Sequence, residues 1–66
     1  MWVDQRAFAK LLQDNETRIV WSSDDLPGCV MVHVWSDART GAVLLREYAH
    51  ESGKVLYWAS DESREK

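Results

Sequence analysis

Cys29 and His33 are the residues of this chain whose types most readily suggest a metal or thiol-imidazole site. They fall in a segment that alternates like a β-strand, so their α-carbons would lie about 13 Å apart at about 3.3 Å per residue. Zinc ligands must converge to about 2.0–2.3 Å from one ion. The spacing therefore excludes a site shared by these two residues on one straight strand. His50 could join Cys29 only if the fold brought them together, and we expect Cys29 to be a small buried hydrophobic residue.

Two further motifs contain residues typical of catalytic or phosphate-binding sites but lack the arrangement that such sites require. Asp24 and Asp25 are adjacent in a loop, so they lack the opposed placement that acid-base catalysis requires and the spacing of a calcium-binding loop. The segment Glu51-Ser52-Gly53-Lys54 matches only the end of a phosphate-binding loop, and a strand is expected after it where a helix is required. We therefore expect no catalytic residue, no metal site and no cofactor, and interpret the chain as a protein that is not an enzyme.

Composition limits the remaining classes. The chain has 66 residues, a net charge of −3 and a single cysteine, so it cannot form an internal disulfide. A domain of this size buries only about 60% of its unfolded surface, which favours oligomerisation or partner binding as a source of stability. We expect no secretion signal, no membrane span and a cytoplasmic location.

The elements that position these residues follow from local patterns. Asp4 can cap a helix that runs to about Gln13, with Phe8, Leu11 and Leu12 as its apolar stripe and Asn15 as a left-handed C-terminal cap. Four alternating segments follow at residues 17–23, 29–35, 42–49 and 54–59. Gly41 and Gly53 are the late residues of the two short loops that connect the last three segments, where a hairpin loop favours a glycine in the left-handed conformation.

The predicted fold is therefore α+β, with an N-terminal helix packed on a four-stranded antiparallel meander in the order α-β-β-β-β. We expect residues 1–59 to form a single domain and residues 60–66 to form a frayed polar tail.

Alternation divides the strand residues into two sets, because successive side chains point to opposite faces of a sheet. We expect the nearly pure hydrocarbon set to face the helix, with Glu47 as its one discordant member; this set contains Ile19, Trp21, Val30, Val32, Val34, Val43, Leu45, Val55 and Tyr57. The second set also contains Arg18, Val20 and Lys54, and it mixes aromatic, aliphatic and basic residues of the kinds enriched at protein interfaces. From it we predict a partner-binding face made of Met31, His33, Trp35, Leu44, Arg46, Tyr48, Leu56 and Trp58.

The sequence thus predicts a protein-protein interaction module that forms a homodimer or docks on a larger protein through this aromatic face. A simpler interpretation is that Trp2, Leu26 and the C-terminal tail cover the face and make it core. The chain could also be a small acidic inhibitor of the kind that phages and mobile elements direct against host proteins, or could bind single-stranded nucleic acid on the aromatic face. The inhibitor could mimic nucleic acid through Asp14, Glu16, Asp24, Asp25 and Glu51, whereas the net negative charge makes nucleic-acid binding the weaker hypothesis.

Overall fold

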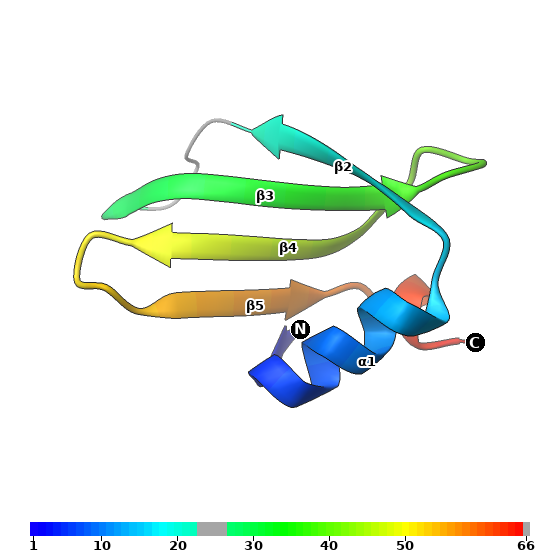
Figure 1. The fold of residues 1–66 in the computed structure, drawn as a ribbon, viewed down its shortest axis with the longest axis horizontal. Helices are drawn as coiled ribbons and strands as arrows, with labels where there is room; N and C mark the ends of the chain where they lie inside the picture. The colour runs from blue at the N-terminus through cyan, green and yellow to red at the C-terminus, as the bar shows by residue number, and fades with distance from the viewer. Residues whose placement is uncertain (23–26, 66) are drawn as a thin grey trace.

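The computed structural model describes residues 1–22 and 27–65 and has one α-helix and a five-stranded antiparallel sheet. The helix α1 spans Gln5–Asp14, and the strands are β1 (Trp2–Val3), β2 (Thr17–Ser22), β3 (Cys29–Asp37), β4 (Val43–His50) and β5 (Val55–Ala59); a short 3₁₀ helix, η1, spans Glu62–Arg64. In Figure 1, β2 to β5 form a meander, and α1 lies at the β5 side of the sheet. The predicted α+β class is confirmed.

The sheet has one strand more than the sequence predicted. β1 pairs with β5, with Trp2 opposite Trp58 and Val3 opposite Tyr57. Two backbone bonds extend this pairing, because the amino group of Met1 donates to the carbonyl of Ala59 at 2.7 Å and the Ala59 amide donates back to Met1 at 2.8 Å. A strand of two residues shows no readable alternation, so only its pairing reveals it.

The helix begins where the sequence predicted. The Asp4 carboxylate accepts a hydrogen bond from the Ala7 amide at 2.8 Å and so satisfies one of the free amides of the first turn. Phe8 is buried, and Leu11 and Leu12 pack beside it against the sheet. The predicted capping and apolar stripe are both confirmed.

The end of the helix differs from the prediction. Asn15 has extended backbone angles, with φ of −121°, so it is not a left-handed cap. Its side-chain amide instead donates to the Leu11 carbonyl at 2.8 Å and to the Ser63 carbonyl at 3.0 Å. Ser63 is fully buried within η1, so the segment that we expected to be frayed is joined to the helix.

The register of β3 corrects the expected division of the two faces. Trp35 lies opposite Ile19 on β2 and Leu45 on β4, which places it on the side of the helix. Val32 and Val34 therefore face the other way, where Val32 lies opposite Tyr48. Both sets of β3 residues are apolar, so hydrophobicity alone does not identify the set that faces the helix. A shift of the strand register by one residue exchanges the two sets.

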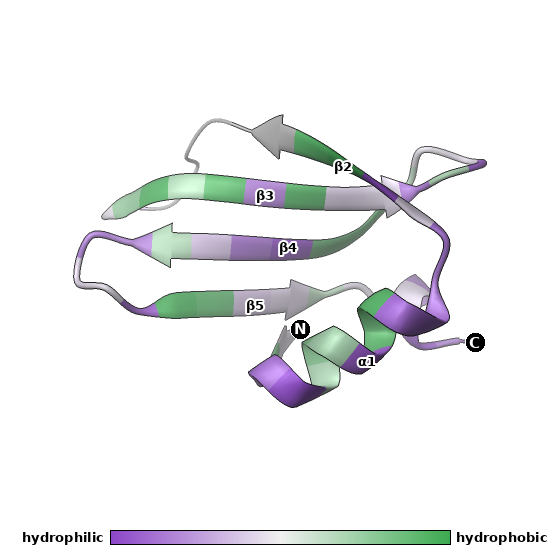
Figure 2. Cartoon of the chain, in the orientation of Figure 1, coloured by the Kyte–Doolittle hydropathy of each residue, from purple (hydrophilic) through white to green (hydrophobic). Residues whose placement is uncertain are grey.

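Each face of the sheet has its own small core. On the helix side, Phe8, Leu44, Leu45 and Ala59 are buried, with Val3, Leu11, Leu12, Trp35 and Tyr57 packed around them. On the opposite side, Cys29, Val32, Val34 and Tyr48 are buried, with Val43 and Trp58 beside them. Figure 2 shows the hydrophobic runs along β2, β3 and β5 and the hydrophilic stretch in the middle of β4.

Three glycines have positive φ, and Gly28 is the most constrained of them. A β-carbon on Gly28 would collide with the His50 imidazole, whose Cε1 atom would lie 3.0 Å away, whereas a β-carbon on Gly41 would have no atom within 4 Å. The φ angles of the two glycines are nearly equal, at +80° and +79°. The three described atoms nearest to a β-carbon on Gly28 all belong to the His50 ring, so the two glycines form a matched pair.

We therefore expect Gly28→Ala to destabilise the fold more than Gly41→Ala does. The left-handed backbone conformation alone should reduce the free energy of unfolding by about 1–2 kcal/mol at either position. Urea denaturation measures the difference, and adding His50→Ala should bring the cost of Gly28→Ala down to that of Gly41→Ala. Equal costs for the two single variants would show that the His50 ring does not restrict the side chain at position 28.

Candidate functional site

The structure separates the eight residues that the sequence grouped on one face. Met31, His33 and Trp35 share the helix side of the sheet with Leu45, and Leu44 is buried in the core on that side. The other four lie on the opposite side, where Arg46 faces Trp58 and Tyr48 faces Leu56. The prediction of one common face is therefore wrong, while the prediction that these residues bind a partner is untested by this arrangement.

We define the helix-free face by the strand residues whose register places them opposite α1: Trp2, Arg18, Val20, Val32, Val34, Arg46, Tyr48, Leu56 and Trp58. Its centre is closed, since Val32, Val34 and Tyr48 are buried. Its margins are open, because Trp2 is 57% exposed, Val20 41% and Leu56 38%. An exposed apolar margin around a packed centre is typical of a surface that contacts another molecule.

Aromatic and basic side chains contact one another on the helix-free face. The guanidinium carbon of Arg46 lies 5.2 Å from the centre of the Trp58 ring, within the range of a cation–π interaction. Arg46 Nη1 also donates to the Tyr48 hydroxyl at 3.1 Å. The Trp2 ring meets the Tyr48 ring edge-on, with centroids 5.6 Å apart. These contacts hold two indole rings and one guanidinium group in fixed positions.

Charge is distributed unequally between the two faces. The strands carry two arginines, Arg18 and Arg46, and the register places both on the helix-free face. The strands also carry two carboxylates, Asp37 and Glu47, and the register places both in the helix-side set. An acidic protein thus presents its strand-borne cations on one face.

Glu47, the discordant member of the predicted helix-side set, has a partner there. Its Oε1 lies 2.8 Å from Nδ1 of His33 across the β3–β4 pair. The His33 ring contacts Trp35 edge-on at 5.9 Å between centroids. His33 therefore lies on the helix side, and not on the face of Arg46, Tyr48, Leu56 and Trp58 with which the sequence analysis grouped it.

The fold brings Cys29 and His50 together, which the sequence left open. They are directly opposite each other in the β3–β4 ladder. The His50 Nδ1 accepts from the Ser52 amide at 3.1 Å and lies 2.8 Å from the Ser52 hydroxyl. In the part of the chain that the structure describes, no group of three or more His, Cys, Asp or Glu could hold a metal ion. Cys29 is buried among Val32 and Tyr48, as the prediction of a small hydrophobic residue required.

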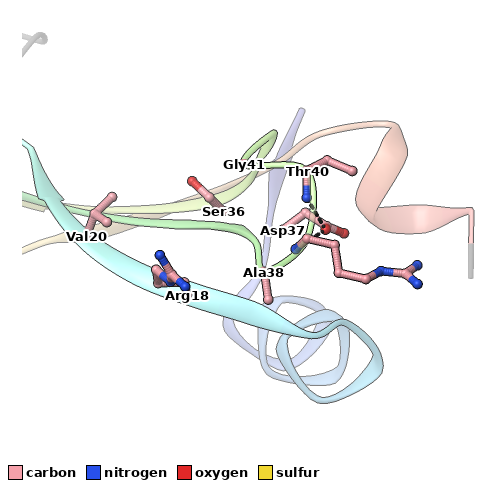
Figure 3. A pocket seen from close by; sticks show the side chains of 8 residues that line it. Arg18, Val20, Ser36, Asp37, Ala38, Thr40 and Gly41 are labelled. Carbon is pink, nitrogen blue, oxygen red and sulfur yellow. Dashed lines mark hydrogen bonds between the residues drawn. The ribbon is translucent and has the colours of Figure 1, made fainter.

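A shallow groove of about 410 Å³ continues the helix-free face toward the β3–β4 loop. Figure 3 shows Arg18, Val20 and Ser36 along the strands and the loop residues at the other end. The Asp37 carboxylate accepts hydrogen bonds from the amides of Arg39 at 2.8 Å and Thr40 at 3.0 Å. It therefore stabilises the β3–β4 turn. The groove extends the exposed surface but brings together no set of reactive groups.

The acidic residues proposed for nucleic-acid mimicry are scattered. Asp14 and Glu16 lie where α1 leads into β2, and Glu51 lies in the β4–β5 turn at the other end of the sheet (Figure 1). Asp14 is also 3.5 Å from the Lys10 ammonium group. Asp24, Asp25 and Leu26 lie outside the described residues. Asp14 and Glu16 are therefore at the opposite end of the sheet from Glu51.

Five residues of the helix-free face are absent from the predicted binding set, namely Trp2, Arg18, Val20, Val32 and Val34, and Trp2 is the one aromatic residue among them. We considered it only as a cover for the aromatic face, and it does pack on Tyr48 while leaving more than half of its surface exposed. Its neighbour Val3 is a β-branched residue, and the pair precedes the helix cap at Asp4. That short signal is compatible with a strand but does not identify its pairing partner.

No protein-family model, curated protein or solved structure matches this chain. Among residues 1–22 and 27–65, no helix is long and apolar enough to cross a membrane. Function must therefore be inferred from the geometry of the surface itself.

The division of the two faces predicts opposite outcomes for two tryptophan variants. Trp35→Ala removes a partly buried ring that packs on Phe8 at 5.4 Å between centroids, and we expect a loss of about 2 kcal/mol of folding free energy, somewhat below the value for a fully buried aromatic residue. Trp2→Ala removes a mostly exposed ring and should cost less than about 1 kcal/mol. Chemical denaturation of both variants measures these values, and a larger loss for Trp2→Ala would contradict the assigned faces.

Proposed function

We propose that this protein is a non-enzymatic, cytoplasmic protein-interaction module whose helix-free face binds an acidic and apolar segment of another protein. The observation that carries the proposal is the exposed indole of Trp2 beside the Arg46–Trp58 stack, on the face that α1 does not cover. A reducing cytoplasm is compatible with a single, buried cysteine.

The residue types support a protein partner. Tryptophan and arginine dominate the binding energy of protein interfaces, because they combine a large apolar area with a polar group of fixed geometry. Arg46 is stacked on Trp58 and bonded to Tyr48, so it loses little side-chain entropy when a partner binds. The partly exposed side chains of Val20 and Leu56 add aliphatic surface at the margins of the helix-free face.

The distribution of charge supports an acidic segment. A stacked guanidinium group can still donate from its edge to a carboxylate. Arg18 adds a second cation on the same face. Glu47 belongs to the opposite set, and the Asp37 carboxylate is bonded to the loop amides of Arg39 and Thr40. The partner segment should therefore carry carboxylates spaced between aliphatic or aromatic side chains.

Single-stranded nucleic acid is the competing ligand for an aromatic and cationic sheet face. The net charge of −3 opposes the approach of a polyphosphate, which carries one charge per nucleotide, more strongly than that of a short peptide with one or two carboxylates. Among the described strand residues, the helix-free face has two arginines and no basic run, which favours a short acidic peptide over a charged polymer.

Selection of peptides from a random phage-displayed library tests the proposal. The wild-type protein should enrich sequences that combine Asp or Glu with aromatic or aliphatic residues. Arg46→Gln and Trp2→Ser should each weaken the selected peptides about tenfold, which corresponds to about 1.4 kcal/mol. Met31→Ser is the control, since Met31 is an exposed apolar residue of the helix side and its replacement should leave the affinity unchanged.

Two outcomes would contradict this function. One is a set of peptides that binds the wild type and the Trp2→Ser and Arg46→Gln variants equally well. The other is tighter binding of an oligothymidylate than of any selected peptide, measured by quenching of tryptophan fluorescence, with an affinity that falls steeply as salt is added. The second outcome would assign the helix-free face to nucleic acid.

A further inference from the structure

The two margins of the sheet are protected very differently. At one margin, β1 is only two residues long and pairs with Tyr57 and Trp58 of β5, so neither β1 nor the remaining part of β5 offers a long run of backbone for further pairing. At the other margin lies β2, which is six residues long and, within residues 1–22 and 27–65, has a neighbouring strand only on its β3 side. Figure 1 shows β2 along the margin farthest from α1.

β2 lacks the features that usually prevent pairing at an open edge. It contains no proline and one charged residue, Arg18, and its ladder with β3 runs without a bulge, whereas the β3–β4 ladder has two register shifts. Ile19 is 51% exposed and Val20 is 41% exposed, on opposite faces of the strand. A long, regular and apolar edge of this kind is a template for a further strand.

We propose that this edge pairs with β2 of a second copy of the chain, so that two five-stranded sheets join into one. An antiparallel pair of identical strands is related by a two-fold axis perpendicular to the sheet. That axis leaves each face on its own side, so residues that lie opposite each other must belong to the same face. Residues of the same face lie opposite each other only when one residue of β2 lies opposite its own copy in the second chain. The two such registers nearest the middle of β2 place the two-fold axis at Ile19 or at Val20.

The position of Arg18 distinguishes these two registers. With the axis at Val20, the two Arg18 residues are displaced from each other by about 13 Å along the strands, at about 3.3 Å per residue. With the axis at Ile19, the displacement is about half of that, and two like charges become diagonal neighbours. The axis at Val20 also places the two exposed Val20 side chains in contact on the helix-free face.

A second copy fits this edge better than an unrelated strand for two reasons. The arrangement needs no complementary charge, since the one charge of β2 is kept away from its own counterpart. It also gives a chain of 66 residues additional buried apolar area, which small domains commonly obtain by oligomerisation. Because the two helix-free faces would lie on the same side of the joined sheet, the dimer would present two copies of the Trp2–Trp58 surface to one partner.

The mass of the protein in solution tests the dimer. Sedimentation velocity over a wide range of concentrations should give twice the chain mass for the wild type and the chain mass for Val20→Lys and Ile19→Lys. Val55→Lys is the matched control, because Val55 is 43% exposed on β5, near the opposite margin of the sheet, and should remain dimeric. Circular dichroism shows that each variant is folded, which separates loss of pairing from loss of structure.

Disulfide trapping tests the geometry independently. In a Cys29→Ala background, a cysteine at the residue on the axis faces its own counterpart at a distance compatible with a disulfide. Val20→Cys should therefore form a covalent dimer on mild oxidation, and Val55→Cys should not. Crosslinking at position 19 in place of 20 would still support pairing of the two β2 edges and would move the axis by one residue.

Three results would overturn this inference. The first is a wild-type protein that is monomeric up to its highest soluble concentration. The second is a dimer that survives Val20→Lys and Ile19→Lys but is lost in Trp2→Ser, which would place the contact on the helix-free face. The third is equal crosslinking at positions 20 and 55. The first and third results do not bear on peptide binding by the helix-free face, so the two proposals can fail separately. The second would assign that face to self-association.

Discussion

The contact of Phe8 with Trp35 and Tyr57 is the interaction on which the rest of the structure depends. The Phe8 ring lies 5.4 Å from the Trp35 ring and 4.8 Å from the Tyr57 ring, and all three belong to the helix-side core. Once Trp35 is on this side, alternation places Val32 and Val34 on the other side of β3. The one amphipathic helix thus sets the facing of the central strand, and through it the composition of both surfaces.

The helix-free face follows from this choice. With Val32 and Val34 at its centre, it closes over Tyr48 and Cys29 and needs no second helix there. The larger residues on β1 and β5 then lie toward the margin, where Trp2 and Trp58 are opposite each other. The face that we propose as a binding surface is therefore a packed centre with an aromatic margin, and this arrangement holds the side chains rigidly before any partner arrives.

The two edges of the sheet also differ in how much of them the chain covers with its own residues. The first residues of the chain cover one margin by pairing with the end of β5, and Asn15 joins α1 to η1. The described part of the chain has no further segment along β2, so the sheet remains open there. A short chain can cover one face and one edge of a sheet with its own residues, and the surfaces that remain are those to which both proposals assign partners.

The elements that local sequence determines were predictable, because their causes lie within a few residues. Asp4 caps the helix through an amide three residues away, and Gly41 and Gly53 provide the positive φ of short hairpin loops. These signals were sufficient for the α+β class and for the meander of β2 to β5. The residue types also identified aromatic and basic side chains that require an explanation, although half of the predicted binding set lies elsewhere.

What only the tertiary structure decided depends on residues far apart in the chain. The strand at Trp2–Val3 exists because β5 pairs with it, and the buried position of Ser63 depends on the amide of Asn15. The facing of β3 is the most consequential case, because each of its two sides could form a core and no local rule distinguishes them. The sequence by itself therefore determined which segments are helix and strand, whereas the packing of Phe8 on Trp35 decided which side chains share a face.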